Sequence, residues 1–199
     1  MTVEEFKEQV RTLDFDEVLN QVLLSEDAAH VEALHTQYIK TRLSEKFHVD
    51  IESIRLIVVG SAKLGFSIVE KKRKDLPKLP RYRPFSADSD VDIAVICQPI
   101  FKYIWNELSE HSFRAPYYPR QSDRLGDYLV CGWLRPDHFP RNVRLRACDD
   151  WWRLFSSLSS QQYLGRRKIR AALFFSIEQL SLYQSKSLRE CVNIETAGE

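Results

Sequence analysis

The sequence lacks any uncharged hydrophobic run of about 18 residues, the length that a membrane-spanning helix needs. Its first residues, Met1 to Lys7, include two glutamates and are too acidic for a secretory signal peptide, so we expect a cytoplasmic protein with no membrane partner. The sequence also lacks an excess of one charge, since 29 basic residues stand against 28 acidic ones. A general affinity for polyanions is therefore excluded, and any nucleic-acid binding must come from a local patch.

Closely spaced cysteines and internal repeats are absent as well. The four cysteines form no Cys-x-x-Cys pair, and they are Cys97, Cys131, Cys148 and Cys191. Such spacing favours reduced thiols in a cytosolic protein over disulfides or a zinc site. The 199 residues, 44% hydrophobic and 12% aromatic, are enough for one globular domain or one compact core with helical additions.

Hydrophobic spacing in the first half of the chain predicts helices that lead into a strand. One or two short helices are expected over Val3–Leu24. Ser25 is followed by two acids, which is typical of a helix N-terminus, and an apolar stripe then continues to Phe47. Apolar runs at Ile54–Val59 and Asp92–Cys97 predict two strands.

The second half is predicted to add strands and then helices. In chain order we expect a helix over Phe101–Leu108, a loop over Ser112–Gly126, strands over Asp127–Arg135 and Asn142–Cys148, a helix opened by Asp149 and Asp150, and a long helix over Arg166–Val192. The predicted fold class is α+β, a small mixed sheet flanked by helices. We divide it into a core at residues 1–150 and a C-terminal helical extension at residues 151–199.

The most informative feature is a Gly-Ser turn followed later by two carboxylates one residue apart. Gly60 and Ser61 end the first predicted strand, and Asp90 and Asp92 open the second. Strand side chains alternate between faces, so the two aspartates point the same way, and two like charges on one face favour a cation between them. Oxygen ligands of this kind suit Mg²⁺ or Mn²⁺ together with substrate phosphates, and a Gly-Ser turn offers N–H groups to a phosphate chain.

This combination resembles the nucleotidyltransferases of the DNA polymerase β-like superfamily, whose signature is a strand ending in Gly-Ser and then an Asp-x-Asp on the next strand. The resemblance implies a polymerase β-like nucleotidyltransferase fold with C-terminal helices. It also implies that Asp90 and Asp92 are catalytic metal ligands for Mg²⁺ or Mn²⁺, and that Gly60, Ser61 and Lys63 bind the nucleotide. In a two-metal site one ion activates the attacking hydroxyl and the other stabilises the leaving pyrophosphate.

The connection between the two motif elements is longer than is usual in the superfamily. Asp90 follows Ser61 by 29 positions, and the extra length, Glu70 to Phe85, is interpreted as an insertion in the hairpin that joins the two strands. The insertion is basic, with Lys71, Lys72, Arg73, Lys74, Lys78, Arg81 and Arg83. It is either a guide for a polyanion such as RNA, a clamp on pyrophosphate, or a solvated loop.

A third carboxylate often completes the superfamily's site as a metal ligand or general base. Asp137, followed by His138-Phe139-Pro140, is the first choice for this catalytic role, and Asp127 and Asp149 compete with it. Trp151 and Trp152 are either a base-stacking pair or core residues.

The implied function is transfer of a nucleoside monophosphate from an NTP to a hydroxyl of a protein, an RNA or a small molecule. Small superfamily members resemble antitoxins that modify a partner toxin and components of bacterial defence operons, so the resemblance also implies a toxin–antitoxin or defence setting with a partner protein. The alternative is a nucleotidyltransferase-like subunit that binds nucleotide or RNA with little or no turnover. A third hypothesis is an RNA-binding protein whose aspartates are incidental.

Overall fold

The computed structural model describes residues 1–73, 76–114, 122–139, 145–161 and 166–196. The helices are α1 (Val3–Thr12), α2 (Phe15–Val18), η1 (Leu19–Leu23), α3 (Ala33–Phe47), η2 (Ile51–Ser53), α4 (Ser61–Leu64), α5 (Gln98–Arg114), α6 (Ser122–Val130), η3 (Pro136–His138), α7 (Arg146–Ser160) and α8 (Ile177–Thr196). The strands are β1 (Arg55–Val59), β2 (Phe66–Ser67), β3 (Lys71–Arg73), β4 (Leu76–Leu79), β5 (Arg83–Pro84), β6 (Val91–Ile96), β7 (Trp133–Leu134) and β8 (Ile169–Phe174). In the described ranges no helix combines the length and the apolar character needed to cross a membrane.

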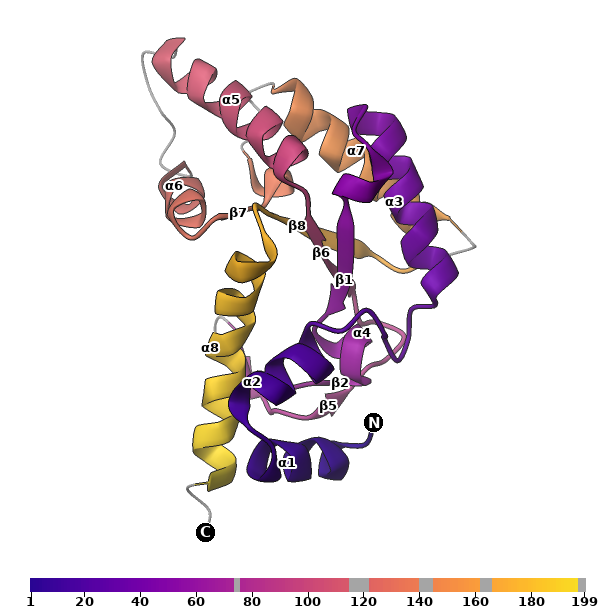
Figure 1. Cartoon of the computed structure of the whole chain (residues 1–199), viewed down its shortest axis with the longest axis vertical. Helices are drawn as coiled ribbons and strands as arrows, with labels where there is room; N and C mark the ends of the chain where they lie inside the picture. The colour runs from indigo at the N-terminus through magenta and orange to yellow at the C-terminus, as the bar shows by residue number, and fades with distance from the viewer. Residues whose placement is uncertain (74–75, 115–121, 140–144, 162–165, 197–199) are drawn as a thin grey trace.

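A mixed four-stranded sheet in the order β1–β6–β8–β7 forms the centre of the molecule (Figure 1). β6 pairs antiparallel with β1 and parallel with β8, and β7 pairs antiparallel with β8. The parallel pair needs a long crossover, and the chain between β6 and β8 contains α5, α6 and α7. The predicted α+β class, with a small mixed sheet flanked by helices, is confirmed.

The two faces of the sheet bury different side chains. Val91, Ile93 and Val95 of β6 pack into a hydrophobic cluster with residues of α3, α5 and α7. The alternate side chains Ala94 and Ile96 join a second cluster, to which α1, η1 and α8 contribute. Asp92 is two residues before Ala94, so its side chain points to the same face of the sheet, the face that α8 covers. It lies at the N-terminal end of β6.

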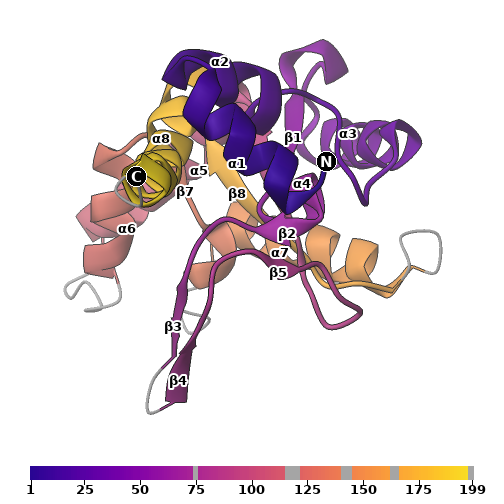
Figure 2. The same cartoon turned by 90° about the horizontal axis from the view of Figure 1, so that it is seen from below.

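The connection between α4 and β6 is a long β-hairpin. β2 pairs with β5 at its base, and β3 pairs with β4 towards its tip, both antiparallel. In Figure 2 the β3–β4 tip projects away from the helices. Most of the insertion expected near residues 70–85 is therefore regular strand structure, while residues 74 and 75 lie outside the described part.

The helix predicted to open at Ser25 begins instead at Ala33, and its N-cap residue Glu32 makes no side-chain capping bond. The reason is tertiary. The backbone N–H groups of Ala29 and His30 donate to the carbonyls of Lys63 and Ala62, so this segment is tied to the α4 turn and does not start a helix.

The strand predicted over Asp127–Arg135 is mostly wrong. Residues up to Val130 belong to α6, and only Trp133–Leu134 forms a strand. Gly132, at φ +71°, turns the chain between them. A short apolar run fits a buried strand or a helix equally well by periodicity, and here the packing decides.

The long helix predicted over Arg166–Val192 is wrong in its first part. Ile169–Phe174 is β8, which lies between β6 and β7 in the sheet, and α8 begins only at Ile177. Ile169 and Leu173 have a spacing that also suits a helix, but the backbone of this segment pairs with β6. Residues 151–199 are consequently not a purely helical extension, because they supply a strand of the central sheet.

Two other predicted segments lie partly outside the described residues. These are the loop over Ser112–Gly126, which includes residues 115–121, and the strand over Asn142–Cys148, which includes residues 142–144. The described ends of the predicted loop are helical instead, because α5 continues to Arg114 and α6 begins at Ser122. Of the remainder, Cys148 is part of α7, which begins three residues before the predicted Asp149. The carboxylate of Glu107 on α5 accepts the N–H groups of the first two residues of α7, at 2.8 and 2.7 Å, and this contact from another element fixes the start of the helix.

Candidate functional site

The two motif elements meet at the end of the β1–β6 pair. Val59 lies opposite Asp92 in the antiparallel register, so the Gly60 turn comes directly after the residue that faces the aspartate. A Cβ atom on Gly60 would lie 3.3 Å from Asp92 Oδ2, and Gly60 has φ +67° and ψ −148°, a backbone conformation that other residues rarely adopt. The turn and the carboxylate are therefore in close contact, as the motif predicted.

The two aspartates repel each other, and Asp90 forms an ion pair with a neighbouring cation. Burial, followed by the neighbouring charge of Asp90, raises the pKa of Asp92 above its ordinary value. Asp90 forms an ion pair with Arg170, in which Arg170 Nε lies 2.8 Å from Asp90 Oδ2. Arg170 lies directly opposite Asp92 in the parallel β6–β8 register. The site thus contains two carboxylates and a guanidinium that contacts only one of them.

A polar groove of about 880 Å³ opens in front of these residues. It is lined by the Gly60–Ser61 turn and by side chains of both charges. The acids are Glu70, Asp88, Asp90, Asp92 and Glu190, and the basic side chains are Lys71, Arg81, Arg83 and Arg170. Arg81 and Arg170 are paired with Glu190 and Asp90, so an anion in this groove meets the backbone of the glycine turn together with Lys71 and Arg83. Backbone N–H groups and basic side chains are the partners that phosphate groups take.

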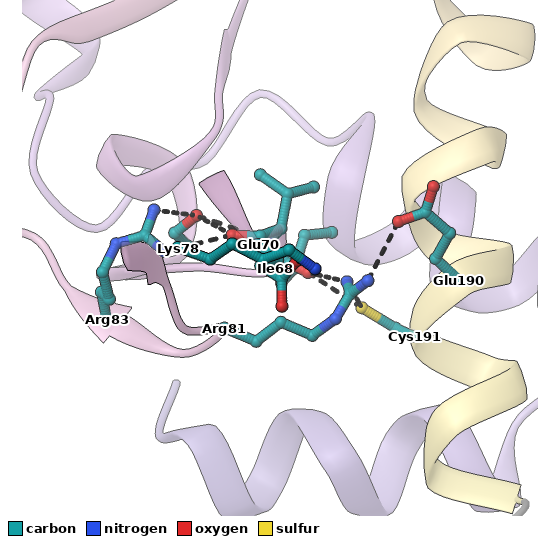
Figure 3. Close-up of polar contacts among 9 residues, drawn as sticks. Ile68, Glu70, Lys78, Arg81, Arg83, Glu190 and Cys191 are labelled. Atoms are coloured by element: carbon teal, nitrogen blue, oxygen red, sulfur yellow. Dashed lines mark hydrogen bonds and ion pairs between the residues drawn. The ribbon is translucent and has the colours of Figure 1, made fainter. Parts of the chain in front are cut away.

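The β-hairpin that borders the groove is held against α8 by hydrogen bonds and an ion pair (Figure 3). Arg81 donates to the carbonyl of Ile68 at 2.5 Å and to the carboxylate of Glu190 at 2.9 Å. Cys191 on α8 donates to the same carbonyl, at 3.2 Å. The hairpin base is therefore fixed against α8, so the basic side chains next to the groove come from an anchored element and not from a free loop.

The donor set suits one divalent cation that arrives with a phosphate ligand. Mg²⁺ is commonly held by one or two carboxylates plus phosphate oxygens, and Asp90 and Asp92 supply two carboxylates on one face. Within the described ranges, no group of three or more His, Cys, Asp or Glu side chains is placed to hold a metal ion. A site made wholly of protein ligands does not fit these residues, whereas a metal–phosphate complex does.

The three acids considered for the third position are not brought to the pair. Asp137 lies in η3 and accepts two hydrogen bonds from Arg135, at 2.8 and 2.7 Å. Burial would raise the pKa of Asp137, but these bonds outweigh it and hold the pKa below its ordinary value. Asp127 and Asp149 are exposed on α6 and α7. None of these acids lines the polar groove.

Arg170 is the site residue that sequence reasoning missed. Its signal is the alternation of β8, in which Ile169, Ala171 and Leu173 are buried and Arg170 falls out of phase with them. The helix predicted for this segment has a different periodicity, so it does not single out Arg170 as a residue on the face of a strand.

Lys63, expected to bind the nucleotide, is directed elsewhere. Its ammonium donates to the hydroxyl of Ser25 at 2.9 Å and to the carbonyls of Ser25 and Asp27, and its side chain is buried. Lys63 lines neither of the two hollows that Asp92 lines. Its hydrogen bonds hold the segment before α3 in place.

We expect Lys63→Met to destabilise the fold by about 1–3 kcal/mol, because the oxygens around its ammonium lose their donor. Nucleotide affinity should stay within twofold of the wild type. Thermal unfolding and calorimetric titration with magnesium–ATP measure the two quantities, with the exposed Lys102→Met as the matched control. If Lys63→Met lost magnesium–ATP affinity but kept its stability, Lys63 would be a nucleotide-binding residue.

Gly60→Ala is expected to cost about 1–3 kcal/mol of stability, because alanine is strained at this backbone conformation. It should also weaken magnesium–nucleotide binding, since the new methyl group would contact Asp92 Oδ2. Gly126→Ala is the matched control: Gly126 lies within α6 with open space around it, so alanine there should stabilise by about 0.5–1 kcal/mol. Wild-type stability and affinity in Gly60→Ala would contradict the close contact.

No protein-family model, curated protein or solved structure matches this chain, so these comparisons assign it to no family. A function for this chain must therefore be argued from its own residues and geometry.

Proposed function

We propose that the chain binds a magnesium–nucleoside triphosphate complex in the polar groove and transfers the nucleoside monophosphate to a hydroxyl group, as nucleotidyltransferases of the DNA polymerase β-like superfamily do. The observation that carries the proposal is the contact between the Gly60 turn and Asp92 across the β1–β6 pair. It brings the backbone of a glycine turn and a carboxylate pair together at one end of the sheet.

The residues divide the work by their chemistry. Gly60 and Ser61 bind the phosphates through backbone and hydroxyl, and Asp90 and Asp92 hold Mg²⁺ or Mn²⁺. When bound, the cation neutralises the triphosphate and favours attack at its α-phosphorus. Lys71, which lines the groove and is exposed, adds positive charge beside the phosphates.

The order of the elements supports the same proposal at the level of fold. A helix leads into β1, and the glycine turn and α4 follow. Asp90 lies just before β6, Asp92 lies at its start, and β8 runs parallel to β6. We propose that this is a polymerase β-like arrangement with the β2–β5 hairpin inserted. The acceptor hydroxyl belongs to a protein, an RNA or a small molecule, and the resemblance favours a toxin–antitoxin or defence setting with a partner protein.

A second candidate, nucleotide binding without transfer, is favoured by Arg170. Opposite Asp92 on the parallel strand the chain has a guanidinium paired with Asp90, and none of the acids considered for the third position lines the groove. Transfer needs a group that takes the proton of the acceptor hydroxyl, and a carboxylate does this where an arginine cannot. The binding step is common to both candidates, and the transfer step separates them.

The test is incubation with each α-³²P-labelled NTP and Mg²⁺ or Mn²⁺, with and without total cellular RNA and protein. Label transferred to an acceptor, and lost in an Asp90→Ala/Asp92→Ala variant, supports the transferase. Magnesium-dependent NTP binding in calorimetry without transfer in any mixture supports the second candidate. Absence of both contradicts the nucleotide site itself.

A further inference from the structure

Next to the polar groove, the chain encloses a smaller hollow of different character. This aromatic cavity, about 390 Å³, is bounded by Tyr128, Trp133, Tyr183 and Gln184 together with aliphatic side chains. Gly60, Asp92 and Arg170 line both hollows. One molecule can therefore lie across them, with a polyanionic part in the groove and an apolar part in the cavity. The volume falls in the range of roughly 300–1,000 Å³ that is typical of small-molecule sites.

The aromatic rings of the cavity hold one another in place. The Trp133 ring lies 4.0 Å from Tyr128 and 5.1 Å from Tyr183, measured between centroids, and stacks on Phe174 at 6.0 Å. Tyr128 and Trp133 are half-buried, and Tyr183 is 48% exposed, so the rings are not sealed within the core. A preformed aromatic wall of this kind binds flat ring systems such as nucleobases.

Gln184 gives the cavity a polar group for which the described residues supply no hydrogen-bonding partner. Its side chain is 9% exposed and lines the cavity, and it forms no hydrogen bond with any residue in the described part of the chain. An amide carries both donors and acceptors. Because Gln184 lines the cavity and its amide atoms are not sealed in the core, they are open to a ligand that enters there. A ligand that presents a donor beside an acceptor would pair with the amide.

We propose that the aromatic cavity is the base subsite of the nucleotide, and that it takes adenine. A glutamine amide matches the adjacent amino donor and ring-nitrogen acceptor of adenine, whereas guanine is commonly matched by a free arginine fork. Both arginines that line the cavity are engaged, Arg135 with Asp137 and Arg170 with Asp90. The inference rests on the proposed function, in which the triphosphate lies in the polar groove, and names ATP as its substrate.

The test is calorimetric titration with magnesium complexes of ATP, GTP and inorganic tripolyphosphate. Wild-type protein should bind ATP about tenfold more tightly than GTP or tripolyphosphate, the size expected for one good amide–base contact. Gln184→Leu should lose about tenfold in ATP affinity and leave tripolyphosphate unchanged. Tyr128→Leu, on a different element, should weaken ATP in the same selective way. The matched control is Gln37→Leu, exposed on α3, with no effect on either ligand.

The outcomes separate this inference from the function on which it rests. ATP bound no more tightly than tripolyphosphate, or no more tightly than GTP, overturns the base subsite and leaves the magnesium–triphosphate site standing. Equal losses of ATP and tripolyphosphate in Gln184→Leu, with a lower unfolding temperature, would show a structural glutamine and also overturn it. If no ligand binds in an Asp92-dependent way, the proposed function and this inference both fail.

Discussion

Replacing Asp92 by asparagine is expected to lower magnesium-dependent nucleotide affinity at least about 100-fold. Loss of residues that merely support a metal ligand costs about 10–100-fold, and loss of the ligand itself should cost no less. The same change should stabilise the metal-free protein by about 0.5–2 kcal/mol, because asparagine removes a buried charge that Asp90 repels. Calorimetry with ATP, in magnesium and in chelator, and thermal unfolding in chelator measure both effects.

The stabilisation should depend on pH in a defined direction. Folding raises the pKa of Asp92, so the folded protein takes up a proton before the unfolded chain as the pH falls. The advantage of Asp92→Asn is therefore complete at neutral pH and disappears as the pH falls from the raised pKa to about 3.9, the ordinary value. Asp127→Asn, an exposed acid on α6 that does not line the groove, is the matched control and should change neither quantity. Undiminished affinity in Asp92→Asn would remove Asp92 from the site.

Trp151→Ala is expected to destabilise the protein by about 3–5 kcal/mol, the usual cost of truncating a buried aromatic residue. Trp151 is 1% exposed and packs between Phe47 of α3 and Phe155 of α7, with ring centroids at 6.1 and 4.8 Å. At about 2–4 °C for each kcal/mol, the unfolding temperature should fall by roughly 6–20 °C. Of the two interpretations of this tryptophan, core residue and base-stacking residue, the structure supports the first.

Trp152→Ala provides the comparison within the same helix. Trp152 is 44% exposed, so its truncation should cost much less than that of Trp151. Chemical denaturation of both variants gives the two free energies of unfolding, and ATP affinity measured well below the unfolding temperature should be unchanged in Trp151→Ala. A large loss of affinity in a folded Trp151→Ala protein would contradict its purely structural role.

The parts of the site that could be predicted from sequence are those encoded within a few neighbouring residues. The end of β1, the Gly60 turn and the shared face of Asp90 and Asp92 follow from strand alternation and from the conformational freedom of glycine. Both predicted strands formed within one residue of their expected bounds. The register that places Val59 opposite Asp92 then follows from pairing two short apolar strands.

The predictions that failed concern segments whose conformation depends on distant partners. Ile169–Phe174 has apolar spacing compatible with a helix, and only pairing with β6 makes it a strand. Ser25 has the sequence context of a helix cap, but Lys63 binds this segment from 38 positions away. The local sequence pattern does not predict such contacts, because the residues that make them lie in distant parts of the chain.

The sequence by itself determined the α+β class, the glycine turn and the carboxylate pair, because each depends on residue type and short-range periodicity. The tertiary structure alone decided what surrounds the pair. It placed Arg170 beside Asp90 and anchored the basic hairpin to α8 through Arg81 and Glu190. The physical reason is that a charged side chain finds a partner far along the chain through strand order and helix packing, so residues 80 or more positions apart become neighbours only when the strands and helices have packed together.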